Sequence, residues 1–455
     1  MIDVFEKSLS LAFSSMILGQ AYLVRRYVGT WLFPACLFGL FWFGYTFFPF
    51  AVLFWVPVKP YGVAFIFLCT VAFSMGSLFY DWKTAFVRNK LKRGTTDLVY
   101  GNSFLKAVFY VSTLSSLAFL TLNLSAQGFS LHDLLFDLYA SAAAYAELHF
   151  SDSLNAPIFD RLSIIFAYLG VILGGFLFSG MPTKTERRLV VVLSFLPSAL
   201  VAVTQTNKGA LFLCIVFFYA GILVRRTSVG KLHLFERGGV RSLTLYTAIV
   251  ILIVSISFLS RARYNIDDDA FIFDRLVPSF ASYSSVHIYA FSDWFAFIIG
   301  RHSEFAYAHE GTSYGFYTFS TLFAQMGSHK VVPPGVYDEY YTYGELLTGN
   351  LYTMFRGLIL DFGIIGSVLF MLAGSFLMHW AFSKMLVNRI PSFTVAVFVF
   401  MMGYFYLSFI ISMLVWSTFY LTFAGLWGVL QINKVITERE FRRLAALEPA
   451  VGVVA

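Results

Sequence analysis

Long apolar runs, separated by short polar segments, dominate the chain. Each run holds about 17 to 25 residues, the length of helix that crosses a hydrocarbon core of about 30 Å. Because such runs are too long and too uniformly apolar for barrel strands, we expect helices, and the predicted fold class is an all-α, polytopic membrane bundle. The pattern predicts about eleven spans, near residues 8–23, 31–56, 62–80, 102–122, 162–182, 189–205, 209–224, 242–260, 351–380, 392–410 and 414–432.

Two segments between these spans are long enough to form structure of their own. In 123–161, apolar residues recur at helical spacing after Ser130 and Asp133, which resemble a capping box, so we expect a helix lying at the membrane interface. The segment 261–350 is too long for a simple connection, which favours a partly helical, functional loop. The predicted organisation is helices in 1–122, the interfacial segment 123–161, helices in 162–260, the large loop 261–350, helices in 351–432 and a tail in 433–455.

Composition and charge agree with a membrane protein and predict its orientation. Hydrophobic residues make up 58% of the chain and charged residues 13%, which excludes an ordinary soluble domain. Most of the 32 lysine and arginine residues lie in one alternate set of loops, which we expect to be cytoplasmic together with the C-terminus. The N-terminus and the segment 261–350 are then expected on the outer side of the membrane. The net charge of +7 reflects these basic loops and does not indicate a nucleic-acid partner.

No nucleotide-binding, hydrolase or zinc-protease motif occurs, and no metal or cofactor is expected. The acidic run "IDDDAF" at 266–271 has two interpretations. It could bind a metal ion in a glycosyltransferase, but a solvated acidic turn is favoured.

Four cations are predicted to lie near the outer ends of spans. Lys208 lies in a tight outer connection, Arg261 and Arg263 lie where a span leaves the membrane, and Arg356 lies just inside the ninth span. Together they suit a membrane-embedded diphosphate, because arginine binds phosphate oxygens in a bidentate manner. The alternative is contact with phospholipid headgroups. Arg356 fits that alternative least, because it lies deepest.

Asp361 lies five residues beyond Arg356 in the same run. On a helix the two side chains diverge by about 140°, so they are not expected to form an i,i+4 ion pair. Asp361 shares a face with Gly357, where a small residue lets another helix approach closely. A buried structural link through Asp361 and Gly357 is therefore favoured over a catalytic role.

The stretch "GNLYTMFRGLILDFGIIG" (349–366) resembles the Asn-hydrophobic-Tyr-Thr…Arg…Asp-Phe-Gly…Gly pattern of the Wzy-type repeat-unit polymerases, the O-antigen polymerase family. "GTSYGFYTFSTLF" (311–323) is similar to a stretch near the end of that family's large periplasmic loop. "TQTNKGALFL" (204–213) resembles a short turn of the family, but with Asn207 and Lys208 in place of Ser-Arg.

The resemblance implies an enzyme of the bacterial inner membrane that works without a metal. Such enzymes move a growing glycan from undecaprenyl diphosphate to a hydroxyl of an incoming lipid-linked repeat unit, and a Wzz-type chain-length regulator is a possible partner. A general base is needed, and the candidates are His302, Glu304, His309 and Glu310, the last two being preferred. Tyr314 and Tyr317 are candidates for stacking on sugar faces, with packing inside the loop as the alternative.

Three other functions remain open. An O-antigen ligase would use the same donor but transfer the glycan to lipid A-core. A lipid-linked oligosaccharide flippase or other transporter is disfavoured, because such proteins usually carry internal repeats and broken helices near the middle of the membrane. A non-catalytic scaffold would not need a buried arginine.

Overall fold

The structure is a computed structural model that describes residues 4–90, 96–130, 132, 136–150, 155, 157–205, 207–235, 272–308, 311–328 and 337–447. The longer helices are α1 (Val4–Val28), α2 (Pro34–Val52), α3 (Pro60–Met75), α6 (Ser103–Ala126), α9 (Pro157–Phe178), α10 (Lys184–Thr204), α11 (Lys208–Ser228), α13 (Ile272–Ile298), α15 (Met354–Val387), α16 (Phe393–Leu407) and α17 (Ser417–Leu447). The shorter elements are α4 (Trp82–Lys90), α5 (Thr96–Tyr100), α8 (Leu138–Phe150), α14 (Phe316–Gln325), the 3-10 turns η1 (Gly76–Phe79) and η3 (Met413–Val415), and the strands β1 (Tyr341–Tyr343) and β2 (Leu347–Gly349).

The architecture is that of a helical, polytopic membrane protein. The structure is 78% helical, and eight helices of its described part are long and apolar enough to cross a membrane. Every predicted span falls on a helix except 242–260, which lies outside the described residues. Helix α16 has 15 residues and is shorter than the eight. The predicted class is therefore confirmed, while the number of spans stays a prediction.

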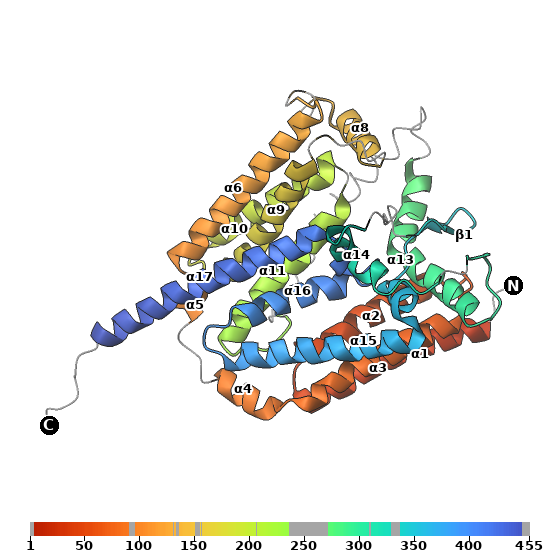
Figure 1. Ribbon diagram of the computed structural model, residues 1–455, viewed down its shortest axis with the longest axis horizontal. Helices are drawn as coiled ribbons and strands as arrows, with labels where there is room; N and C mark the ends of the chain where they lie inside the picture. Colours follow the sequence, from red (N-terminus) through yellow and green to blue (C-terminus); the bar gives the residue numbers. More distant parts are fainter. Residues whose placement is uncertain are drawn as a thin grey trace.

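The helices form two groups joined by α16 and α17 (Figure 1). In one group α9 packs against α6, α10 and α11. In the other, α15 and α1 pack against α3, and α2 packs against α1. Helix α16 contacts α11 on one side and α15 on the other, while α17 packs along α9 and α16. The C-terminal helices therefore hold the two groups together.

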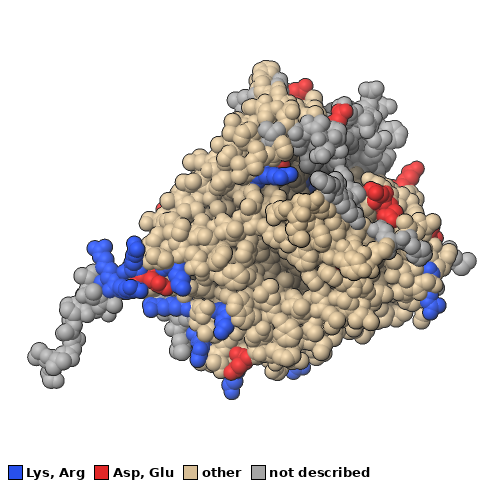
Figure 2. Space-filling model, viewed as in Figure 1, with Lys and Arg blue, Asp and Glu red and all other residues tan. Residues whose placement is uncertain are grey.

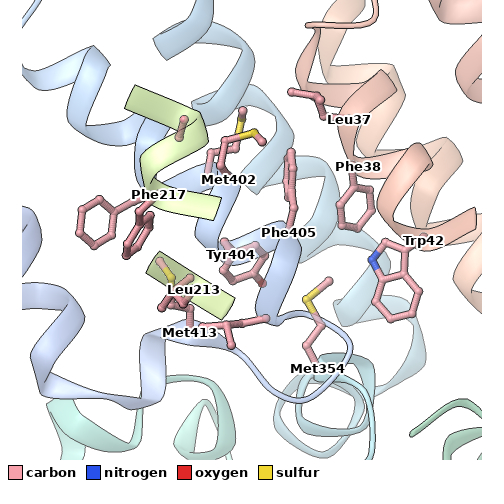
Figure 3. Packing of buried hydrophobic residues seen from close by; sticks show 14 of the residues in the cluster. Leu37, Phe38, Trp42, Leu213, Phe217, Met354, Met402, Tyr404, Phe405 and Met413 are labelled. Carbon is pink, nitrogen blue, oxygen red and sulfur yellow. The ribbon is translucent and has the colours of Figure 1, made fainter. Parts of the chain in front are cut away.

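Buried aromatic and sulfur-containing side chains fill the junction around α16 (Figure 3). Phe405 lies with its ring centroid 5.1 Å from that of Phe38 of α2, on the second group's side. At the start of α15, Phe355 packs at 4.8 Å against Trp42, and the backbone amide of Met354 donates to the carbonyl of Ser408 at 2.9 Å. These contacts anchor the first turn of α15, from which Arg356 projects.

The two ends of the bundle differ in charge. Lysine and arginine gather where α4 lies and where α17 runs beyond the bundle, and acidic side chains are visible toward the other end (Figure 2). We call these the basic end and the opposite end. Helix α15 begins at the opposite end, where α13, α14 and the strands lie (Figure 1).

The first of the two long connecting segments contains a helix within its predicted bounds. Helix α8 is fastened to its neighbours through Tyr145, whose hydroxyl accepts from Asn123 Nδ2 at 2.8 Å and donates to Asp160 Oδ1 at 3.4 Å. These bonds join α8 to α6 and α9. Asp133, half of the predicted capping box, lies outside the described residues.

The second segment, 261–350, has helices and a hairpin in its described part. Its described part contains the 27-residue helix α13, the helix α14 and an antiparallel hairpin in which Tyr341 pairs with Gly349. The hairpin packs on α13, where Ser282 Oγ accepts from the amide of Thr348 at 2.9 Å. Because α13 carries polar residues such as His287 and Asp293 among its apolar ones, its sequence does not give an uninterrupted apolar run.

Two glycines turn the backbone where the site is built. Gly300 (φ 70°) ends α13 and directs the chain into the segment 301–308, with the amide of Arg301 bonded to Ala296 O at 2.8 Å. Gly363 (φ 72°) interrupts α15 after its first two turns. Positive φ at these positions favours glycine, which has no Cβ to clash. The turns of α15 that carry Arg356 are thus a short helical piece set off from the rest of α15.

Candidate functional site

Arg356 is the centre of the candidate site. It lies in the first turn of α15 and is 0% exposed. Its Nη2 donates to Glu339 Oε2 at 2.8 Å, and the side chain of Glu339 is 27% exposed. A buried guanidinium requires such compensation, because removing a charge from water without a partner is costly.

Four aromatic rings surround this guanidinium. The distances from Arg356 Cζ to the ring centroids are 3.9 Å for Tyr337, 4.2 Å for Tyr352, 5.1 Å for Trp294 and 5.9 Å for Tyr307. Each ring attracts the cation through its electron-rich face. We call the group the arginine cage, and it comprises Arg356, Glu339, Trp294, Tyr307, Tyr337 and Tyr352.

The cage unites segments that are distant along the chain. Trp294 comes from α13, Tyr307 from the segment after α13, Tyr337 from the residues before β1, and Tyr352 from just before α15. The rings also contact one another, with Tyr337 and Tyr352 in edge-to-face geometry at 5.3 Å. Glu339 is the most exposed member, so the carboxylate forms the solvent-facing side of the cage.

Asp293 supports the cage from α13. Its Oδ2 accepts from the Tyr307 hydroxyl at 3.0 Å, and its Oδ1 accepts from the backbone amide of Glu304 at 2.8 Å. Burial raises the pKa of the Asp293 carboxyl, and the hydrogen bonds from Glu304 and Tyr307 oppose this rise. Burial likewise raises the pKa of Tyr307, so its hydroxyl stays protonated and can donate. Asp293 thereby holds the Tyr307 ring beside Arg356.

The carboxylate of Asp361 contacts the segment around the start of α14, not the residues of the cage. Its carboxylate accepts from the backbone amides of Tyr317 at 3.0 Å and Thr318 at 2.7 Å, and from Ser313 Oγ at 2.5 Å. These amides belong to the first turn of α14, where a carboxylate also complements the helix dipole. Asp361 is thus linked to the neighbouring helix α14, which is the kind of buried contact that was predicted for it.

Gly357 lies where α14 and the cage approach α15 closely. A Cβ built on Gly357 would lie 3.3 Å from Tyr317 Cβ and 3.4 Å from the Tyr337 hydroxyl oxygen. Tyr317 in turn stacks on Tyr337, with ring centroids 5.7 Å apart. The stretches 311–323 and 349–366, which carry the family resemblance, thus contact each other directly.

The other predicted site residues have varied positions. The side chains of His302 and Glu304 are exposed on the segment after α13, and Tyr314 is 81% exposed beside the start of α14. Lys208 is buried at the start of α11, in the other helix group from Arg356. The remaining four predictions, Arg261, Arg263, His309 and Glu310, lie outside the described residues.

No family model, no curated protein and no solved structure matches the chain. Among the described residues, no three histidine, cysteine, aspartate or glutamate side chains are grouped so that they could hold a metal ion. The site must therefore be judged on its own chemistry, which is that of a caged cation beside a partly exposed carboxylate.

Glu339, Asp293 and the four rings were not among the site residues predicted from the sequence. Two of the rings lie close in sequence to the charged residues of the cage: Tyr352 precedes Arg356 by four positions, and Tyr337 precedes Glu339 by two. This proximity was the local sign of the cage in the sequence. Such aromatic residues are common throughout this chain, with 26 tyrosines and 8 tryptophans, so spacing alone could not distinguish these.

Proposed function

We propose that the chain is a polymerase of lipid-linked oligosaccharide repeat units. In this reaction the growing glycan leaves undecaprenyl diphosphate and joins a hydroxyl of the incoming lipid-linked unit. The single observation that carries the proposal is the arginine cage, which places a permanent cation and a partly exposed carboxylate together at one end of a membrane bundle. The family resemblance of 349–366 supports the same reaction.

The cage suits a lipid diphosphate as leaving group. The bond from the sugar to the diphosphate breaks with negative charge developing on the phosphate oxygens, and a positioned guanidinium stabilises that charge. Rings hold Arg356 in place, so little reorganisation is needed when the charge develops. Lys208, Arg261 and Arg263 remain proposed contributors to the same diphosphate, and Tyr314 and Tyr317 remain proposed contacts to sugar rings.

The charge distribution supports a periplasmic site in the inner membrane. Basic residues concentrate at the end opposite the cage (Figure 2). Because cytoplasmic loops are enriched in lysine and arginine, we assign the basic end and the C-terminus to the cytoplasm, and the N-terminus to the periplasm. The cage then faces the periplasm, where lipid-linked repeat units are presented at the outer leaflet.

The proposal is tested by reaction of the purified protein with a lipid-linked repeat unit. We expect a ladder of products that differ by one repeat unit. Absence of any elongated product, with protein that remains folded, would contradict the proposal.

Gene deletion separates the polymerase from a ligase. Loss of a polymerase leaves one repeat unit attached to lipid A-core, whereas loss of a ligase leaves none. A flippase would be indicated by repeat units that accumulate at the cytoplasmic face.

A further inference from the structure

Glu339 lies on the solvent-facing side of the caged cation. Arg356 is 0% exposed, and Glu339 is the partly exposed member of the cage that is bonded directly to it. Tyr337 and Tyr352 cover the guanidinium at 3.9 and 4.2 Å. An anion that reaches Arg356 from the solvent-facing side therefore has to take the place of the Glu339 carboxylate.

Hydrogen bonds that do not involve this ion pair hold the backbone around Glu339 in place. Asn350 Nδ2 donates to the carbonyl of Tyr337 at 3.1 Å, and the Tyr352 hydroxyl donates to the carbonyl of Glu339 at 3.4 Å. The side chain can therefore leave Arg356 by rotation while its backbone stays beside the cage.

We propose that Glu339 is the general base of the transfer, an inference that rests on the proposed function. The donor diphosphate replaces the Glu339 carboxylate on Arg356, and the displaced carboxylate then lies within a few ångströms of the reacting sugar. The acceptor oxygen forms a bond to the anomeric carbon, the bond from that carbon to the phosphate oxygen breaks, and the diphosphate leaves with the electron pair. The acceptor proton passes to Glu339, which returns it to solvent.

Three other described carboxylates near the cage, Asp293, Asp361 and Glu304, are less suited to that step. Asp293 is buried and accepts two hydrogen bonds that position the segment 304–307. Asp361 accepts three hydrogen bonds at the start of α14. Glu304 has an exposed side chain, but the contact that joins it to the cage region is made by its backbone amide. Glu339 alone among these four contacts the cation directly.

The test compares donor binding with turnover in Glu339→Gln and Glu339→Asp. Glu345→Gln is the matched control, because Glu345 is an exposed glutamate in the turn of the neighbouring hairpin. Binding is measured with undecaprenyl diphosphate by native mass spectrometry, and turnover with lipid-linked repeat unit purified from polymerase-deficient cells.

We expect Glu339→Gln to bind undecaprenyl diphosphate at least as tightly as the unmodified protein, because the competing charge is gone. Its elongation rate should fall about 100-fold or more, the usual contribution of a general base. Glu339→Asp keeps the charge and should still fold. It should elongate chains faster than Glu339→Gln.

Two results would overturn the inference. Glu339→Gln could elongate within about fivefold of the unmodified protein, far from the loss expected for a base. It could instead lose diphosphate binding and elongation together while it stays folded, which would assign Glu339 to holding the cage only. If the unmodified protein binds no diphosphate and elongates nothing, the proposed function itself fails, and this outcome is distinct from both.

Discussion

Arg356 and Asp361 lie five positions apart on α15 and hold two different segments of the chain against it. The guanidinium of Arg356 binds Glu339 at 2.8 Å, whereas the carboxylate of Asp361 binds the amide of Thr318 at 2.7 Å. One helix start thereby organises both the arginine cage and α14. Arg356 thus contributes to the cage and Asp361 to the attachment of α14, and substitutions can distinguish the two contributions.

Asp361→Ala should destabilise the protein through α14. It removes the acceptor for two backbone amides and for Ser313, and hydrogen bonds to a charged group are worth about 1.5–3 kcal/mol each. We expect a lower unfolding temperature in detergent and a lower yield in the membrane. Asp338→Ala, at an exposed aspartate next to Glu339, is the control and should leave both unchanged. Equal stability of the two variants would refute the role of Asp361.

Gly357→Ala tests the close approach of α14 to α15. Its new methyl group would press on Tyr317 and Tyr337, and overpacking of this kind usually costs about 1–3 kcal/mol. Gly374→Ala is the matched control on the same helix, since no atom lies within 4 Å of the position its Cβ would take. We expect Gly357→Ala to unfold at a lower temperature than Gly374→Ala, and the reverse order would contradict the packing described.

Substitutions of Tyr337 separate its ring from its hydroxyl. Tyr337→Phe keeps the ring over Arg356 and should retain more stability and activity than Tyr337→Ala. Tyr337→Ala loses the closest cation–π contact, worth about 0.5–2 kcal/mol, and leaves space beside the guanidinium. Thermal unfolding measures the effect on stability, and chain elongation measures the effect on activity. If the two variants behave alike, the ring does not position Arg356.

Asp293 should make stability depend on pH. Its pKa is raised by burial above the ordinary 3.8, so the folded protein holds this proton more tightly than the unfolded chain. The stability that the proton contributes is fully present below about pH 3.8 and is lost as pH rises through the folded-state pKa. Asp293→Asn cannot ionise, so its unfolding temperature should fall less between pH 4 and 7. If the unfolding temperature varied with pH identically in both proteins, the contribution of the Asp293 proton to stability would be excluded.

The sequence predicted most of the helices, but Arg356 was the only member of the cage that it predicted as a site residue. The spanning segments are visible as long apolar runs because lipid admits few polar side chains, and helical geometry was enough to separate Arg356 from Asp361. Helix α13 was included in a loop because Ser285, His287 and Asp293 interrupt its apolar pattern; the structure buries all three against neighbouring elements.

The cage depends on contacts that no local pattern contains. Trp294, Tyr307 and Tyr337 reach Arg356 from positions well upstream, and the turn at Gly300 and the hairpin on α13 bring them together. Glu339 was one acidic residue among many in the segment 261–350, and only its distance to Arg356 distinguishes it. Long-range packing, which sequence periodicity does not report, determines the chemistry of the site.

The most direct test of the central claim is the product length made by purified Arg356→Ala from a lipid-linked repeat unit. Arg301→Ala is the control, because Arg301 is an exposed arginine in the segment after α13. We expect the unmodified protein and Arg301→Ala to make a ladder of long chains, and Arg356→Ala to make none although it accumulates as folded protein. A ladder of normal length from Arg356→Ala would contradict the assignment of Arg356 to the diphosphate.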